Sequence, residues 1–302
     1  MFKKIFRELK RGTLIRKIIF RIKAWWLLVR KVNIKNPKLY LEKYYYYLNK
    51  DKIDLDNPKT FNEKINWYKL NYKNDLMPIC ADKVKVYDYV KDCGLEHILN
   101  KRYGVYNNLD EIDLNSLPDQ FVLKNNSDSG GIFICKNKSK FKKGAKQVYK
   151  KMKKDFSHVK LEWPYHLIEK KLLIEELIKT KDGKSPVDYK FLCFNGEPKI
   201  IFVVSNRDTT CDFDFFDLEW NHLDCSKQFH KNAPIIPKKP KNLKEMLEYA
   251  KILSKPFPFA RIDFYNEDGK VYFGEITFFP GAGISPITPK KYDYIIGEHF
   301  KI

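Results

Sequence analysis

Residues 261–277, RIDFYNEDGKVYFGEIT, decide the fold. Apolar residues dominate both halves of this stretch, and the polar sequence NEDG at 266–269 separates them, which predicts a β-hairpin. Since successive side chains of a strand point to opposite faces, a connection of about five residues turns Asp263 and Glu275 toward the same side. A register shifted by one residue separates the two carboxylates. The hairpin therefore predicts a pair of acids at one point of a sheet.

The polar side chains of this hairpin suit a magnesium nucleotide. Arg261 shares the face of Asp263, and Thr277 shares the face of Glu275. Two carboxylates are the usual minimum that a protein contributes to Mg²⁺ bound with nucleotide phosphates, because phosphate oxygens and water complete the coordination. An exposed hairpin with a cross-strand pair between Arg261 and Glu275 is the alternative that the sequence leaves open.

The other predicted elements mix strands and helices as in α+β proteins. Short strands occur in pairs with helical patterns between them, so antiparallel sheets are expected rather than a doubly wound sheet. The predicted strands cover about residues 121–124, 132–135, 171–178, 187–194 and 198–204, and the predicted helices cover about 60–70, 82–94, 142–154 and 243–254. Thr60 and Glu63 form a capping-box pattern at the start of the first of these helices.

The composition indicates a folded, basic protein. The chain has 302 residues, 43% of them apolar and 15% aromatic, which excludes wholesale disorder and collagen-like or coiled-coil rods. Of the net charge of +20, a net +10 falls within residues 1–31. Because the excess is concentrated, the rest of the chain is only moderately basic, and the sequence argues against a nucleic-acid partner. The six cysteines have no metal-binding spacing, as expected for reduced, buried thiols of a cytoplasmic protein.

Residues 1–32 are predicted to form a basic amphipathic helix. Apolar residues recur at near-helical spacing, Lys and Arg occupy the intervening positions, and Trp25 and Trp26 stand near the end. Such a helix suits an anionic membrane surface, and a core helix with a solvated basic face is the alternative. Because charges interrupt the apolar residues throughout, neither a signal peptide nor a membrane-spanning helix is expected.

A serine- and glycine-rich loop joins two of the predicted strands. It reads NNSDSGG at residues 125–131 and lacks the GxxxxGK[ST] pattern of a P-loop. Its backbone N–H groups and the Ser127 and Ser129 hydroxyls can cover phosphates, and Gly130 and Gly131 allow a close approach. A plain hairpin loop is the alternative.

Charged residues also interrupt two apolar strands. Glu175 and Glu176 lie within IEELI at 174–178, and Lys190 lies within DYKF at 188–191. Charge within an apolar strand is costly unless it is paired or functional. These residues are therefore either site residues or members of structural ion pairs.

In their order along the chain, these motifs resemble the ATP-grasp superfamily, and specifically the TupA-like ATP-grasp proteins of bacterial surface-polysaccharide biosynthesis. The resemblance covers about residues 55–290. The segments that carry it are TFNEK at 60–64, ADK at 81–83, LPDQFVLK at 117–124, NSDSGG at 126–131, IEEL at 174–177, DYK at 188–190, FNG at 194–196, RID at 261–263, GEIT at 274–277 and PG at 280–281.

The resemblance implies an ATP-grasp fold, in which two α+β subdomains grip ATP between antiparallel sheets, with ATP and Mg²⁺ as cofactors. The membrane-associating helix at 1–32 is followed by a helical lead-in region at 33–100 and a catalytic region at 101–302. The catalytic region is expected to divide into a phosphate-loop subdomain of about 101–172 and a metal-binding subdomain of about 173–302.

The resemblance also implies a role for each site residue. The residues implied to bind ATP are Lys83, Lys124, Ser127, Ser129, Gly130, Gly131, Glu175, Glu176 and Leu177. Arg261 is implied to stabilise the transferring phosphoryl group, with Lys190 as a further catalytic phosphate contact. Asp263 and Glu275 are implied to hold Mg²⁺. Superfamily members often have Asn where this chain has Thr277, so the third implied Mg²⁺ ligand at this position could only be a hydroxyl oxygen.

The implied reaction is Mg·ATP-dependent ligation of a carboxylate to an amine through an acyl phosphate. Phosphoryl transfer needs positioning and cations more than a nucleophilic side chain, and the sequence has no Ser-His-Asp or Cys-His pattern. The family context implies capsule, O-antigen or teichuronic-type polysaccharide biosynthesis, with an amino acid and a hexuronic acid as one substrate pair.

The expected partners are a small-molecule or lipid-linked glycan acceptor, an amine donor, and an anionic membrane bound through residues 1–31. The expected location is the inner face of the bacterial cytoplasmic membrane. Three alternatives stay open: an ATP-dependent sugar or glycan phosphotransferase, a polysaccharide glycosyltransferase with Asp212 and Asp214 as a metal-binding DxD motif, and a non-catalytic membrane or nucleic-acid adaptor.

Overall fold

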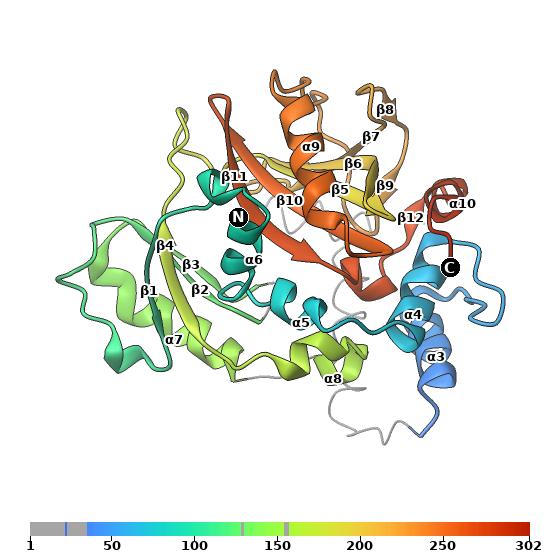
Figure 1. Ribbon diagram of the computed structural model, residues 1–302, viewed down its shortest axis with the longest axis horizontal. Helices are drawn as coiled ribbons and strands as arrows, with labels where there is room; N and C mark the ends of the chain where they lie inside the picture. Colours follow the sequence, from blue (N-terminus) through green and yellow to red (C-terminus); the bar gives the residue numbers. More distant parts are fainter. Residues whose placement is uncertain (1–21, 23–34, 128–129, 154–156) are drawn as a thin grey trace.

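The computed structural model describes Ile22 and residues 35–127, 130–153 and 157–302 (Figure 1). The predicted amphipathic helix at 1–32 lies, apart from Ile22, outside the described residues, and Ser129 does too. Within the described part of the chain, no helix is long and apolar enough to cross a membrane.

An antiparallel sheet of four strands forms the first sheet of the fold. The strand order is β1-β4-β2-β3, with β1 at Arg102–Tyr106, β2 at Phe121–Asn125, β3 at Ile132–Cys135 and β4 at Leu172–Glu176. Helix α7 (Phe141–Met152) packs on β2 and β3. Its buried residues Phe141, Ala145, Val148 and Met152 follow helical spacing, which directs one apolar face of α7 into the core of this sheet.

The second sheet has six strands in the order β11-β10-β5-β6-β7-β8. Its strands are β5 at Asp188–Phe194, β6 at Glu197–Ser205, β7 at Asp212–Phe216, β8 at His222–Leu223, β10 at Phe259–Glu267 and β11 at Lys270–Thr277. Helix α9 (Leu243–Ser254) packs on β5, β6 and β10, and its Tyr249 ring lies 6.4 Å from the ring of Phe264. Since Arg261 and Asp263 alternate with Phe264 along β10, they point to the face opposite α9.

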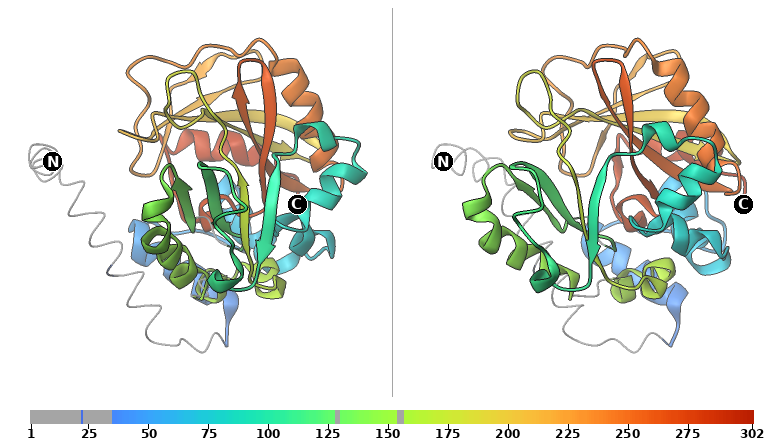
Figure 2. Two further views of the ribbon diagram at one scale, coloured as in Figure 1. Left: turned by 90° about the vertical axis from the view of Figure 1, so that its left-hand side faces the viewer. Right: turned by 60° about the vertical axis from the view of Figure 1, so that its left-hand side comes forward.

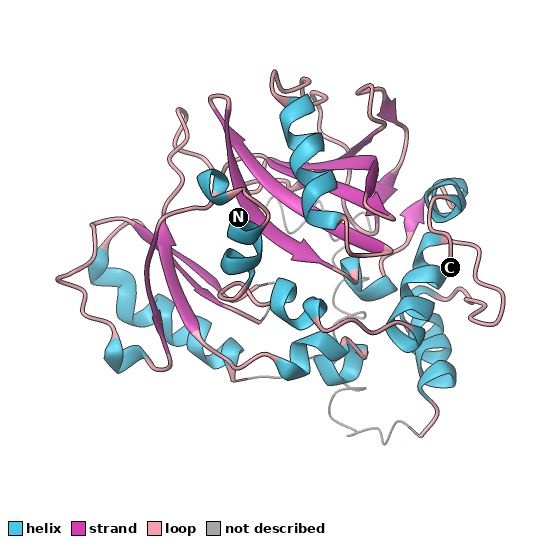
Figure 3. Cartoon of the chain, in the orientation of Figure 1, coloured by secondary structure: helices cyan, strands magenta, loops and turns pink. Residues whose placement is uncertain are grey.

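All pairs of the two sheets are antiparallel, so the predicted α+β class is confirmed. The sheets stay distinct in both rotated views (Figure 2), and helices cover their outer faces (Figure 3). The connection from β4 to β5, residues 177–187, joins one sheet to the other.

The other helices surround the two sheets. They are α3 at Pro37–Asn49, α4 at Phe61–Asn71, α5 at Leu76–Ala81, α6 at Val86–Asp92, α8 at Ser157–Lys160, α10 at Lys291–Glu298, and the 3₁₀ helices η1 at Glu96–Ile98, η2 at Leu109–Glu111, η3 at Lys138–Lys140, η4 at Trp163–Leu167 and η5 at Pro280–Gly283. A small pair of strands, β9 at Ser226–Lys227 and β12 at Ile287–Thr288, lies beside β7 of the second sheet. The predicted capping box is present, because the Glu63 backbone donates to the Thr60 hydroxyl at 3.2 Å and the Thr60 backbone donates to the Glu63 carboxylate at 2.8 Å.

One predicted helix is wrong in its extent. The helix expected at 82–94 is instead a turn followed by α6, and the unpredicted helix α5 precedes it. The division of the catalytic region near residue 172 stays a prediction. Strand β4 pairs with β1 and β2, so the first sheet itself continues to Glu176.

The six cysteines are all free. Four of them are buried as expected, whereas Cys93 and Cys211 are only half-buried. Burial raises the pKa of the Cys193 thiol to about 12, so the deeply buried thiols pack as apolar groups.

Candidate functional site

A row of side chains crosses the second sheet on the face opposite α9. Glu275 on β11 lies across from Asp263 on β10, and Asp263 lies across from Lys190 on β5. Lys190 in turn lies across from Phe202 on β6. Because directly paired residues of neighbouring strands point to one face, the four side chains form a line. We call Glu275, Asp263 and Lys190 the charged row.

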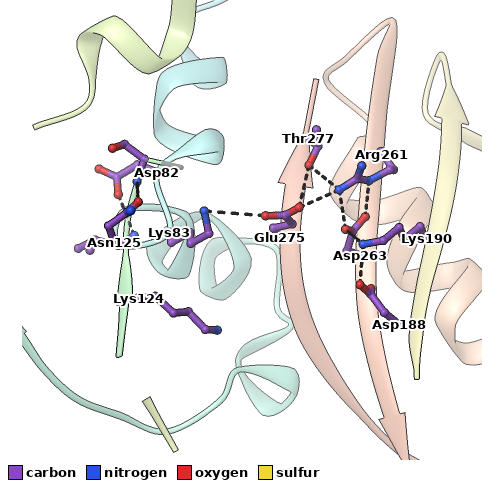
Figure 4. Close-up of polar contacts among 12 residues, drawn as sticks. Asp82, Lys83, Lys124, Asn125, Asp188, Lys190, Arg261, Asp263, Glu275 and Thr277 are labelled. Atoms are coloured by element: carbon purple, nitrogen blue, oxygen red, sulfur yellow. Dashed lines mark hydrogen bonds and ion pairs between the residues drawn. The ribbon is translucent and has the colours of Figure 1, made fainter. Parts of the chain in front are cut away.

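Arg261 joins the two acids of the charged row (Figure 4). Its Nε donates to Asp263 Oδ1 at 2.7 Å, and its Nη2 donates to Glu275 Oε1 at 2.7 Å. Nη2 also donates to the Thr277 hydroxyl at 3.0 Å. Arg261 is 8% and Asp263 only 2% exposed, so the alternative of a solvent-exposed hairpin is wrong.

The alignment of the two acids depends on a β-bulge at Gly274. The strands of the hairpin end at Glu267 and resume at Lys270, so the connection has two residues instead of about five. Continued without a shift, that register would place Gly274 across from Asp263 and turn Glu275 to the α9 face. The bulge inserts one residue and brings Glu275 back. A Cβ at position 274 would lie 2.9 Å from the Asp263 carbonyl oxygen, so glycine makes this close approach possible.

A third carboxylate, that of Asp188, lies beside the charged row. Lys190 Nζ lies 2.7 Å from Asp188 Oδ2 and also contacts Asp263. Arg207 contacts the same oxygen of Asp188. The other oxygen, Oδ1, is buried and has no hydrogen-bond partner among the described residues. The charged residues of the apolar strand β5, Asp188 and Lys190, are therefore paired with each other and with charges of neighbouring elements.

Lys83 approaches the charged row from the turn between α5 and α6 (Figure 4). Its Nζ lies 3.9 Å from Glu275 Oε2. The turn is fixed to the end of β2, because Asn126 Nδ2 donates to Asp82 at 2.8 Å and the Lys83 backbone N–H donates to the Asn126 carbonyl at 3.2 Å. Lys83 thereby links the first sheet to the second.

Lys124 also lies at this boundary between the sheets, where Figure 4 shows it on the same side as Lys83. Its ammonium contacts Glu175 on β4, whose other oxygen accepts a hydrogen bond from the Tyr87 hydroxyl at 2.9 Å. Glu176 is exposed, and Leu177 begins the connection between the two sheets. The structure therefore brings Lys124 and Glu175 together but leaves the Glu176 side chain pointing to solvent.

The serine- and glycine-rich loop closes the β2–β3 hairpin. The Asn125 backbone N–H donates to the Gly131 carbonyl at 2.9 Å, and Lys151 donates to the Gly130 carbonyl at 2.5 Å. The Ser127 backbone N–H donates to the Asn125 side chain at 3.3 Å. A Cβ on Gly131 would lie 1.8 Å from Asn125 Nδ2, so a larger residue there would displace the Asn125 amide.

The electrostatics of the charged row differ between its two acids. Burial alone would raise the pKa of Glu275, but the charges of Lys83, Arg261 and Lys190 lower it to about 2. Burial raises the pKa of Asp263 above its ordinary value, against the pull of Arg261 and Lys190. Glu275 is therefore ionised throughout the neutral range.

Asp212 and Asp214, the residues of the DxD alternative, lie on a different face. They pair with Ser205 and Val203 on β6, which places them on the α9 side of the sheet. Asp214 is fully buried and accepts hydrogen bonds from His222 at 3.0 Å and from the Ala233 backbone at 3.1 Å. Asp212 accepts from Asn206 and Thr210. Because both carboxylates are already hydrogen-bonded to neighbouring residues, they do not form the metal site that the glycosyltransferase alternative needs.

Three residues at the site were missed by the sequence analysis. Asp188 lies two residues before Lys190 in an apolar strand, and this charged position in an apolar strand could have identified it. Arg207 and Lys227 come from residues 205–240, whose sequence has no pattern that pointed to a site. Lys227 lies on β9 with its Nζ 5.5 Å from the centre of the Phe202 ring.

The sequence profile of the family described as TupA-like ATPgrasp matches residues 63–301. The chain belongs to this family. The match spans both sheets and includes the charged row, Lys83 and Lys124, so the two-sheet architecture is an ATP-grasp fold. No curated protein matches the chain significantly.

Among solved structures, the ATP-grasp chain is similar to D-alanine–D-alanine ligase from Bacillus anthracis, with 19% identity, a TM-score of 0.46, and coverage of 74% of this chain and 66% of that one. It is also similar to D-alanine–D-alanine ligase from Helicobacter pylori, with 19% identity, a TM-score of 0.42, and coverage of 68% and 53%. For L-amino acid ligase from Bacillus licheniformis the identity is 15%, the TM-score 0.43, and the coverage 74% and 50%. The chain thus spans about half to two thirds of the length of these proteins.

Proposed function

We propose that this protein is a Mg·ATP-dependent ligase that joins a carboxylate to an amine through an acyl phosphate. The observation that carries the proposal is the charged row with Arg261, facing Lys83 at the boundary between the two sheets. Acids and cations alternate there on a buried face, which is costly for a structural purpose alone. Membership of the ATP-grasp family supports the same reading.

Asp263 and Glu275 fit a magnesium ion that carries nucleotide phosphates. Arg261 Nη2 lies 2.7 Å from Asp263 Oδ2 and 2.7 Å from Glu275 Oε1, so both carboxylates reach one small region. Among the described residues, no three or more His, Cys, Asp or Glu side chains gather as a metal site, so phosphate oxygens and water would have to complete the coordination. Bound there, Mg²⁺ neutralises phosphate charge and orients the γ-phosphate.

The remaining residues have distinct tasks in this proposal. Lys83 and Lys124 hold phosphates from the side of the first sheet, and Arg261 and Lys190 stabilise charge on the transferring phosphoryl group. An oxygen of the substrate carboxylate attacks the γ-phosphorus, the bond to the β-phosphate oxygen breaks, and ADP leaves. The amine then attacks the acyl carbon, inorganic phosphate leaves, and the amine loses a proton. No nucleophilic side chain is needed.

The proposed substrates are a carboxylate on a glycan precursor, free or lipid-linked, and an amine such as an amino acid. This part of the proposal follows from the resemblance to proteins of capsule, O-antigen and teichuronic-type polysaccharide biosynthesis. The basic segment at 1–31 would hold the enzyme at the cytoplasmic membrane, where such precursors are assembled.

The nucleotide site is tested by thermal unfolding with the non-hydrolysable analogue Mg·AMPPNP. A ligand present at 100 Kd adds about 2.7 kcal/mol to the stability of the folded state, and a tenfold weaker site gains only about 1.4 kcal/mol at the same concentration. We expect the first value for wild type and the second or less for Glu275→Gln. Glu248→Gln, the same change on the exposed face of α9, is the matched control. Stabilisation by a UDP-sugar with Mn²⁺ and not by Mg·AMPPNP would contradict the proposal.

The reaction class is tested by the fate of the γ-phosphate. With hydroxylamine as the amine and D-glucuronate as the carboxylate, a ligase releases ADP and phosphate and forms a hydroxamate. A phosphotransferase instead forms a stable phosphorylated sugar, with ADP but without free phosphate. The second pattern would replace the ligase by the kinase alternative while leaving the nucleotide site in place.

A further inference from the structure

Three cations surround the Phe202 ring at the end of the charged row. The nearest charged groups lie 5.9 Å from the ring centre for Lys190, 5.5 Å for Lys227 and 5.9 Å for Arg261. A phenyl face attracts each cation by a modest amount, but the cations repel one another. Lys190 and Arg261 offset this repulsion with carboxylates of the site.

Lys227 differs from the other two cations. Its ammonium has no hydrogen bond or ion pair with any residue that the structure describes, and it lies 5.5 Å from the centre of the Phe202 ring. Burial, together with the charges of Arg261 and Lys190, lowers the pKa of Lys227 to about 7, against the smaller pull of the Asp263 and Asp293 carboxylates. A half-buried cation beside other cations weakens the folded state unless an anion joins it.

The position of Lys227 is nevertheless fixed by its neighbours. Lys227 lies across from Ile287 in the β9–β12 pair, and the Gln228 backbone N–H donates to the Pro286 carbonyl at 2.8 Å. A Cβ on Gly281 would lie 3.3 Å from Lys227 Cε, so the glycine leaves space for the lysine side chain. The ammonium is thus held in place before any ligand arrives, as expected for a preorganised binding group.

The site has more positive than negative side chains, so it can accommodate an anion. Three carboxylates face five cations there; the carboxylates are Asp188, Asp263 and Glu275, and the cations are Lys83, Lys190, Arg207, Arg261 and Lys227. Lys83 lies at the Glu275 end of the charged row, and Lys227 lies at the Phe202 end. An anion bound beside Lys227 would therefore lie at the opposite end of the charged row from Lys83, the proposed phosphate-binding lysine.

We infer that Lys227 and Arg261 form the binding site for the carboxylate of the acceptor, above the Phe202 ring. The inference rests on the proposed function and assigns the carboxylate to one end of the charged row. There one carboxylate oxygen pairs with the Lys227 ammonium, and the other is free to attack the γ-phosphorus beside Arg261. Lys227 thus sets the specificity for an anionic acceptor.

The test uses the full chain and measures unfolding temperatures during titrations with acetate and D-glucuronate, with Mg·AMPPNP saturating. We expect both carboxylates to stabilise wild type, and Lys227→Met to bind them at least about tenfold more weakly because a charged partner is lost. Lys227→Arg retains the charge and is expected to retain binding. Lys199→Met, which removes an exposed lysine from β6, is the matched control and is expected to behave as wild type. All variants should bind Mg·AMPPNP within about twofold of wild type.

Ligand-free stability gives a second readout. Lys227→Met removes an unpaired cation and is expected to unfold at or above the temperature of wild type, whereas Lys190→Met, which loses two carboxylate partners, unfolds lower. The inference is overturned if Lys227→Met loses Mg·AMPPNP affinity, which makes Lys227 a nucleotide contact. It is also overturned if the carboxylates fail to stabilise wild type or stabilise Lys227→Met equally.

The two proposals fail separately. If wild type does not bind Mg·AMPPNP, the proposed function is wrong. The same titrations on nucleotide-free wild type and Lys227→Met then still decide whether Lys227 binds a carboxylate.

Discussion

The buried carboxylate of Asp293 is expected to make the stability of this protein depend on pH. Asp293, at the first turn of α10, is 3% exposed and accepts two hydrogen bonds at 3.0 Å from the Asn62 side chain on α4 and one at 3.2 Å from the Asn62 backbone. Burial nevertheless raises the pKa of Asp293 to about 6, and nearby Glu63 adds to this shift. Asp293 therefore links α10 to α4, and the free energy of burying its carboxylate depends on pH.

The sign of that dependence follows from linkage. The pKa of Asp293 is higher in the folded state than its ordinary value of 3.8, so the folded state binds the proton more tightly. The resulting stabilisation is complete below about pH 4 and is lost as the pH rises through about 6, a change of about 3 kcal/mol. We expect Asp293→Asn to lack this loss, so that the free energy of unfolding of the variant relative to wild type rises by most of that amount between pH 4 and pH 7. Urea unfolding across this range measures it.

The control for this titration is Asp110→Asn, which removes a carboxylate at an exposed position. Its free energy of unfolding relative to wild type should stay constant within about 0.5 kcal/mol over the same range. A pH-independent difference between Asp293→Asn and wild type would show that Asp293 does not titrate in this way.

Elements with a strong repeating pattern were predictable from the sequence, and single-residue events were not. Helix α9 has the predicted bounds, because a long amphipathic period and clear ends define it. Helix α5 was missed because it is short and contains Pro78, which a helix accepts only in its first turn. The pairing of Asp263 with Glu275 was predicted, but for the wrong connection length, since the bulge at Gly274 leaves no periodic signal. Lys227 reaches the site from the two-residue strand β9, which is too short to leave a periodic signal in the sequence.

The bulge makes a prediction at the scale of the hairpin. Gly274→Ala places a methyl group 2.9 Å from a backbone oxygen that cannot move aside, so we expect a loss of about 1–3 kcal/mol in the free energy of unfolding. We also expect Mg·AMPPNP affinity to fall at least about tenfold, because the slipped register turns Glu275 away from Asp263. Urea unfolding and nucleotide titration measure the two effects.

A stability-matched control separates them. Gly183→Ala strains a glycine with φ of +69° in an open loop, with nothing within 4 Å of the added Cβ. It should lower stability by about 1 kcal/mol and leave nucleotide affinity unchanged. If Gly274→Ala loses stability but binds Mg·AMPPNP as Gly183→Ala does, the bulge has no role in positioning Glu275.

At the scale of the whole molecule, the positive charge falls into two separate groups along the chain. Within the two sheets, the buried cations meet carboxylates at the charged row and leave an excess that suits anionic ligands. The larger concentration, a net +10 within residues 1–31, precedes the part of the chain that the family profile matches. A binding role for that segment therefore need not involve the proposed nucleotide site, and we expect membrane binding and nucleotide binding to be separable.

That separation gives the last prediction. Each Lys or Arg near an anionic bilayer contributes roughly 1 kcal/mol, so replacing Lys3, Lys4, Lys10 and Lys17 with Gln is expected to weaken binding to phosphatidylglycerol vesicles by roughly a thousandfold. Mg·AMPPNP affinity should not change. The control replaces Lys142, Lys143, Lys146 and Lys150, which are exposed on α7, and removes the same charge from the first sheet. Co-sedimentation at low and at physiological salt measures the partition, and binding should weaken with salt because surface charges are screened. An equal loss in both variants would assign membrane binding to total charge and not to residues 1–31.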